Sequence, residues 1–131
     1  MKLSETALTL VALAVVAPNS RLLVVETPRG QLELPGLEIG EPDAMAAHLV
    51  QFVSKAGLDQ MPSLTLYLPG LRLRKQQATP MMGVIHFVRL AKAQPLEILN
   101  SRYETTSALA GDERATATTR AVARWLLQAK A

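Results

Sequence analysis

The sequence contains no cysteine, which excludes disulfide bonds, thiol catalysis and thiolate metal sites. Aromatic residues are scarce at 4% of the chain, so the core has to be built mainly from leucine, valine, alanine and methionine. Charged residues make up only 19% against 49% hydrophobic, a balance typical of a globular protein. With 131 residues, we expect a single domain over residues 1–131.

The sequence also lacks a hydrophobic run of membrane-spanning length near its start. The apolar run at residues 7–17 is shorter than the roughly 20 residues that a transmembrane helix needs. A turn sequence, Pro18-Asn19-Ser20, follows it, and then a second strand-like run at residues 21–27. This pattern predicts a buried hairpin rather than a signal peptide. We therefore expect a cytoplasmic protein that does not associate with membranes.

Charge of either sign is limited, and the formal net charge is +3. The main basic cluster is LRLRK, in which Arg72 and Arg74 would share one face of a strand and Lys75 follows. Such a cluster is either a solvated strand face or a contact for an anionic group such as a phosphate. Nucleic acid is not an expected partner, because the cluster is short and has no interleaved aromatic residues.

The hydrophobic pattern predicts an α+β fold, an α/β/α sandwich with helices on a mixed sheet. One helix is expected to end at Gly57 after an apolar stripe, and a second to run from an N-cap at Asp112 toward Lys130. The stretch 100–110 is expected to be a loop or short helical turn. Strands are expected at residues 6–17, 21–27, 31–34, 63–68, 71–75 and 82–90, with a further short one at 95–99.

The segment from Gly30 to Leu58 resembles the signature segment of the Nudix hydrolases. Leu32-Glu33-Leu34-Pro35-Gly36 matches the strand and turn that open this signature. Gly40-Glu41 matches its loop, Ala46-Ala47 an alanine pair common in its helix, and Gly57-Leu58 its end. The resemblance covers about thirty residues closely and most of the chain in layout. It implies a Nudix-like mixed sheet with a helix after the signature loop and a C-terminal helix.

The departures from the signature fall on its metal-binding glutamates. The loop is two residues shorter than the family spacing and the helix one residue longer. Counting back from Gly57, the Arg-Glu pair falls on Val50-Gln51 and the Glu-Glu pair on Ser54-Lys55. With the gap at the other end, the two pairs fall on Leu49-Val50 and Val53-Ser54. Neither alignment recovers a carboxylate.

This substitution changes what the helix can bind. Positions 51, 54 and 55 share one helical face, and three carboxylates there would hold a divalent cation that bridges to a diphosphate. Gln51 and Ser54 are neutral, and Lys55 puts a positive charge where the cation would lie. The usual metal site is therefore expected to be lost. Lys55 can contact a phosphate directly, or it is a solvated lysine favoured by the helix dipole.

Other residues offer weaker candidates for chemistry. Glu33, Glu38 and Glu41 cluster before the helix, where they either form a displaced metal site or order the loop and cap the helix. His48 and His86 have no third ligand at a recognisable spacing, so a zinc site is not expected. Tyr103 and Glu104 lie near where the resemblance places specificity residues.

Three functions remain open from the sequence. The first is a non-catalytic module that binds a nucleotide or other small phosphorylated ligand through Gln51, Ser54 and Lys55, with Arg72 or Arg74 assisting. The second is a divergent pyrophosphohydrolase of nucleoside diphosphate derivatives, which would use Glu38 and Glu41 with Mg²⁺ or Mn²⁺. The third is a homodimeric scaffold in which apolar strands pair between copies. No cofactor is expected for the first or third function.

Overall fold

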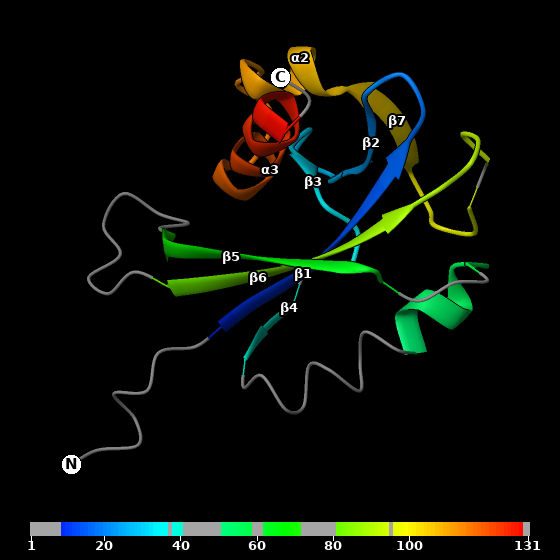
Figure 1. Cartoon of the computed structure of the whole chain (residues 1–131), viewed down its shortest axis with the longest axis horizontal. Helices are drawn as coiled ribbons and strands as arrows, with labels where there is room; N and C mark the ends of the chain where they lie inside the picture. Colours follow the sequence, from blue (N-terminus) through cyan, green and yellow to red (C-terminus); the bar gives the residue numbers. More distant parts are fainter. Residues whose placement is uncertain are drawn as a thin grey trace.

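The computed structural model describes residues 9–36, 38–40, 51–58, 62–71, 81–94 and 96–129. A seven-stranded mixed sheet forms its frame, in the order β3-β2-β1-β6-β5, with β4 paired to β1 and β7 paired to β2 (Figure 1). The predicted α+β class is confirmed. The elements are β1 (Thr9–Ala17), β2 (Arg21–Glu26), β3 (Leu32–Glu33), β4 (Glu38–Gly40), β5 (Leu64–Leu71), β6 (Met81–Arg89), β7 (Ser101–Thr105), α2 (Thr106–Ala110) and α3 (Ala117–Ala129).

Strand β1 is the centre of the sheet, and all nine of its residues are buried. It pairs in parallel with β6 and antiparallel with β2. The β1–β2 connection is the predicted hairpin, and Asn19 and Ser20 in its turn both have positive φ angles. Continuous burial, instead of alternation, is expected for a strand that is covered on both faces.

Two apolar layers cover the two faces of the sheet. On one face, Val122 and Leu126 of α3 pack against residues such as Leu10 and Ile85. On the other face, Val53 packs against residues such as Leu13 at the end of the helical segment 51–55. Figure 1 shows α2 and α3 on one side of β1, β5 and β6 and the short green helix on the other. None of the described helices is long and apolar enough to cross a membrane.

Several predicted strand positions were wrong. The predicted loop at residues 38–40 contains β4, and β5 continues to Leu71, where a separate strand was predicted to begin. The short strand predicted at 95–99 is absent from residues 96–99. A strand lies instead at β7, in the first half of the stretch predicted to be a loop or short helical turn, because all five of its residues pair with β2. Pairing with a distant strand overrides the weak local pattern here. The second half of the stretch forms the short helix α2, in agreement with the helical alternative.

The predicted N-cap of the last helix was also wrong. Helix α3 begins at Ala117, and the Thr116 hydroxyl accepts a hydrogen bond from the Thr119 amide at 3.2 Å, as an N-cap does. The Asp112 carboxylate instead accepts a hydrogen bond from the Arg114 amide at 2.8 Å, which forms a turn before the helix. Aspartate is favoured both at helix N-caps and in turns, so the local sequence does not distinguish the two positions.

Candidate functional site

The helical segment 51–55 ends in a motif that fixes its position. The Gly57 amide donates to the Ser54 carbonyl and the Leu58 amide to the Val53 carbonyl, each at 3.2 Å. Gly57 has φ +85°, and Val53 and Leu58 are buried in the same apolar cluster. These are the features of a Schellman motif, which stops a helix at a glycine. The predicted helix stop at Gly57 is confirmed.

The Pro35–Gly36 turn lies against the same helix. Gly36 has φ +70°, and a Cβ atom built there would lie 3.1 Å from the Phe52 ring. The Leu13 amide of β1 donates to the Pro35 carbonyl at 3.2 Å. The turn is thus held between the central strand and the helix, and only glycine combines this backbone conformation with so close a ring.

Gln51, Ser54 and Lys55 are all exposed, whereas Val53 and Ala56 on the other side of the helix are buried. The structure therefore brings together, on one solvent-facing side, the three positions predicted from the i, i+3, i+4 spacing. Within the described part of the chain, Lys55 makes no ion pair. A second feature lies at the helix end: the Glu97 amide donates to the Ala56 carbonyl at 3.1 Å, and its carboxylate lies beside Gly57.

The carboxylates proposed as a displaced metal site are only partly described. Glu33 lies in β3, and burial raises the pKa of its carboxyl group. Glu38 lies in β4 with its backbone opposite Val11 of β1, and Glu41 lies outside the described residues. Among the described side chains, no three of His, Cys, Asp and Glu are arranged to hold a metal ion. Arg72, Arg74 and His48 also lie outside the described residues.

His86 lies in β6, where its Nδ1 is 3.0 Å from the Thr65 hydroxyl of the neighbouring strand. Burial lowers its pKa, which favours the neutral imidazole. This is the arrangement of a hydrogen-bonded strand residue. Tyr103 similarly donates its phenolic proton to the Gln94 carbonyl at 2.7 Å.

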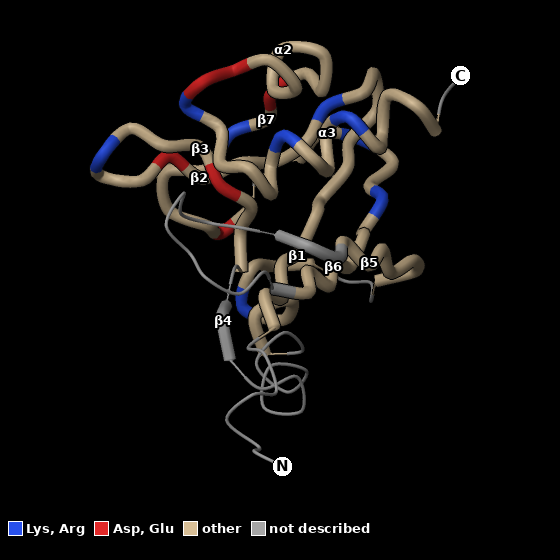
Figure 2. The backbone as a smooth tube through the Cα atoms, turned by 90° about the vertical axis from the view of Figure 1, so that its left-hand side faces the viewer, with Lys and Arg blue, Asp and Glu red and all other residues tan. Residues whose placement is uncertain are grey.

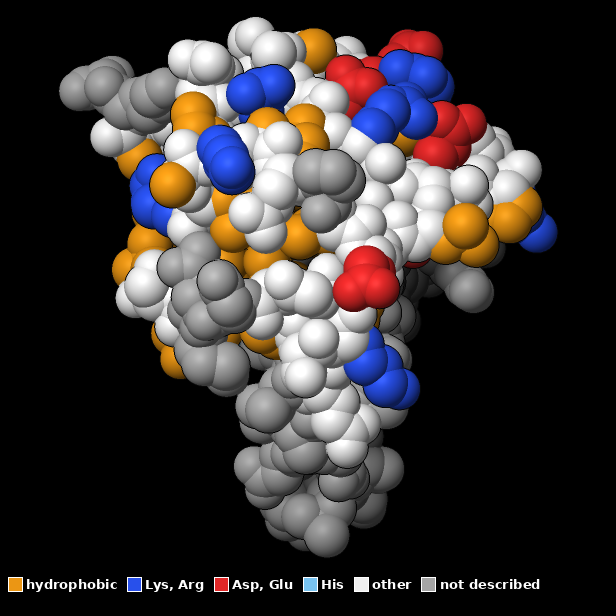
Figure 3. Space-filling view, turned by 90° about the vertical axis from the view of Figure 1, so that its right-hand side faces the viewer, with side chains coloured by type: hydrophobic (Ala, Val, Ile, Leu, Met, Phe, Trp, Pro, Cys, Tyr) orange, Lys and Arg blue, Asp and Glu red, His pale blue; other side chains and the backbone are white. Residues whose placement is uncertain are grey.

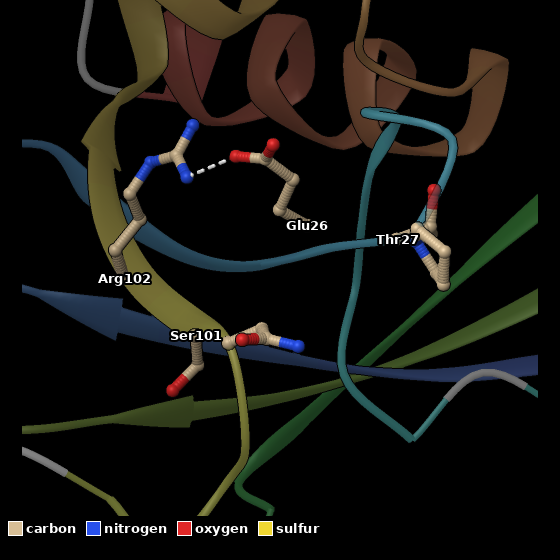
Figure 4. Close-up of a pocket in the computed structure, with 6 residues that line it drawn as sticks. Glu26, Thr27, Ser101 and Arg102 are labelled. Atoms are coloured by element: carbon tan, nitrogen blue, oxygen red, sulfur yellow. Dashed lines mark hydrogen bonds and ion pairs between the residues drawn. The ribbon is translucent and has the colours of Figure 1, made fainter.

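An open pocket of about 600 Å³ lies where β2 ends and β7 begins. Arg102 lines it, and its guanidinium forms ion pairs with Glu26 and Glu104, each at 2.6 Å. Figure 4 shows the Glu26 and Arg102 side chains pointing toward each other across the pocket. Hydrogen bonds to Arg102 hold the pKa of Glu26 below its ordinary value. The remaining lining residues are Thr27, Pro28, Asn100 and Ser101.

No sequence motif indicated this pocket, because Glu26 and Arg102 are 76 residues apart. Glu104 was singled out for its place in the chain, and its actual partner is Arg102. Figure 2 shows acidic residues gathered near β2, β3 and β7, and Figure 3 shows acidic and basic side chains intermingled at one corner of the surface. This corner is therefore not a patch of one charge sign.

Comparisons with known proteins identify the fold. No family model and no curated protein matches the sequence. A MutT protein from Methanosarcina mazei superposes with a TM-score of 0.64 at 11% identity, over 95% of each chain. The chain has the Nudix fold. RenU, a Nudix hydrolase from M. smegmatis, gives a TM-score of 0.56 at 14% identity, covering 95% of this chain and 85% of that one.

A further structure with this fold is the C-terminal domain of mouse MUTYH, solved in complex with human PCNA. Its TM-score is 0.59 at 15% identity, over 94% of this chain and 88% of that one. Identities this low establish the fold alone. The chemistry of this Nudix-like domain has to be argued from its own residues.

Proposed function

We propose that this Nudix-like domain binds a nucleotide or another small phosphorylated ligand beside the 51–55 helix, without the usual metal-dependent hydrolysis. The observation that carries the proposal is the exposed face of Gln51, Ser54 and Lys55 on a helix that stops at Gly57. An amide, a hydroxyl and an ammonium can each donate a hydrogen bond to a phosphate oxygen. None of these three residues carries a carboxylate that could hold a divalent cation.

The position of the helix stop supports counting the signature back from Gly57. The alternative alignment would place a former metal ligand at Val53, whose side chain is only 3% exposed and packs in the core. A side chain that binds a metal ion has to lie on the solvent-exposed side of the helix, as Ser54 and Lys55 do. Lys55 then stands where the signature has a glutamate, so the local charge favours an anion directly.

Thermal unfolding tests this proposal directly. We expect ADP and inorganic pyrophosphate to raise the melting temperature in the presence of EDTA, because binding to the folded state stabilises it without a metal. Lys55→Glu should abolish this shift, since it reverses the charge that meets the phosphate. Arg124→Glu is the matched control, because it makes the same charge change on an exposed position of α3, across the sheet. Unchanged binding in Lys55→Glu would contradict the proposal.

The second candidate is a divergent hydrolase that uses the carboxylates before the helix. The raised pKa of Glu33 favours it, because a carboxyl group that stays protonated to a higher pH than usual can take part in proton transfer. RenU is a hydrolase by its description, whereas the MUTYH domain was solved bound to another protein, so the fold occurs in both contexts. Turnover of nucleoside diphosphate compounds that requires Mg²⁺ or Mn²⁺, and that Glu38→Gln or Glu41→Gln removes, would replace the first proposal.

A further inference from the structure

Two strands at different margins of the sheet differ sharply in charge. Among the described residues, β7 pairs with β2 alone and carries Arg102 and Glu104, which form ion pairs. Within the same described part of the chain, β5 pairs with β6 alone, and its eight residues, LTLYLPGL, include no charged residue. Edge strands in soluble proteins usually carry charges that prevent pairing with another strand. Strand β7 has that protection and β5 lacks it.

Strand β5 also exposes apolar side chains on both faces of the sheet. Leu64 is 45% exposed and is paired with Phe87, on the face that α3 covers. Tyr67 is 63% exposed and is paired with Val84, on the opposite face. A partner strand alongside β5 would cover both side chains at once, whereas a helix or a small molecule would cover one face only.

We propose that two copies of this chain associate through β5. The β5 strand of one copy would pair antiparallel with the β5 strand of the other. The backbone N–H and C=O groups along the outer side of an edge strand form hydrogen bonds best with another strand. The expected partner is therefore an extended segment. A second copy fits because an uncharged strand meets no like charge when it is paired with itself around a two-fold axis. Because β5 carries no charge, it has no electrostatic preference for an oppositely charged partner. Pro69 lacks an amide hydrogen, so the pairing is confined to residues 64–68.

Sedimentation over a concentration series tests the pairing. We expect a monomer–dimer equilibrium, and Leu64→Lys or Tyr67→Lys should weaken it about tenfold or more, because each dimer acquires two lysines at the joined edge. Leu99→Lys is the matched control. Leu99 is an apolar residue that is 83% exposed in the turn before β7 and is not part of β5, so this variant should dimerise like the unmodified chain. Circular dichroism of all the variants checks that they remain folded.

Hydrogen exchange supplies a second readout at the backbone. The amides of residues 64–68 should exchange more slowly as protein concentration rises, while those of β7 should not change. A protein that is monomeric throughout the series overturns the proposal, and so does a dimer that both lysine variants leave intact. Protection of β5 only on adding a different protein also overturns it, because the occupant is then not a second copy. None of these results depends on ligand binding at the 51–55 helix.

Discussion

At the scale of single residues, the environments of two glutamates on neighbouring strands shift their pKa values in opposite directions. Glu26 ends β2 and pairs with Arg102, which holds its pKa below the ordinary value. Glu33 in β3 is half-buried, which raises its pKa. Val25 of β2 is the register partner of Glu33, so the neighbouring Glu26 side chain points to the opposite face of the sheet from Glu33. Burial is the main cause of the pKa shift of Glu33, and the hydrogen-bonded ion pair with Arg102 is the main cause for Glu26.

These directions predict opposite pH dependences. Because the folded pKa of Glu33 is above its unfolded value, its favourable contribution is present at acid pH and is lost as pH rises through the folded pKa. Glu33→Gln should therefore raise the melting temperature at neutral pH and have little effect in acid. Glu26 has a lowered folded pKa, so its contribution is present at neutral pH and is lost as pH falls through that pKa.

Glu26→Gln should accordingly lower the melting temperature slightly at neutral pH, because the ion pair is at the surface and contributes little. Melting temperatures of both variants and the unmodified chain across the acid-to-neutral range give the comparison. If Glu33→Gln destabilises the protein at neutral pH, its carboxylate makes a favourable contact when charged, and burial is not the dominant effect.

At the scale of elements, two glycine turns show how the helix is attached to the sheet. Gly30 and Gly36 both have positive φ angles, but only Gly36 has a neighbour within 4 Å of a built Cβ, the Phe52 ring. The positive φ angle at Gly30 therefore concerns the backbone alone. Gly36 also determines the contact between its turn and the helix that carries the candidate site.

Alanine substitutions separate the two effects. Gly30→Ala should lower the free energy of unfolding by about 1–2 kcal/mol, because alanine is strained at this φ angle. Gly36→Ala should lose about 1 kcal/mol more, because the new methyl group presses on the ring. Urea denaturation measures both values. Adding Phe52→Leu to Gly36→Ala should recover part of the extra loss, and equal losses in the two single variants would contradict the close contact.

At the scale of the whole molecule, both apolar layers share one sheet. Trp125 of α3 packs 5.1 Å from Phe87 of β6, measured between ring centroids, on one face. Val53 packs on the opposite face. Since β1 and β6 contribute side chains to both layers, neither layer can be lost while the other remains packed.

Fluorescence of Trp125, the only tryptophan, therefore reports on global unfolding. Val53→Ala should lower stability by about 2 kcal/mol by removing buried methyl groups. Its fluorescence and circular dichroism transitions should shift together, although Trp125 lies across the sheet. Leu127→Ala, at a partly exposed position on α3, should change stability by less than about 0.5 kcal/mol. A fluorescence transition that stays in place in Val53→Ala would show that the two layers unfold separately.

The sequence by itself determined the order of the hairpin, the turn and the helix, and the absence of a carboxylate at Gln51, Ser54 and Lys55. These features depend on residue identity, periodicity and a glycine stop, all of which act within a few residues. Only the tertiary structure decided that 101–105 is a strand, that Glu26 meets Arg102, and that β5 is an uncharged edge. Strand pairing joins residues far apart in the chain, so no local pattern reveals which strand lies beside which.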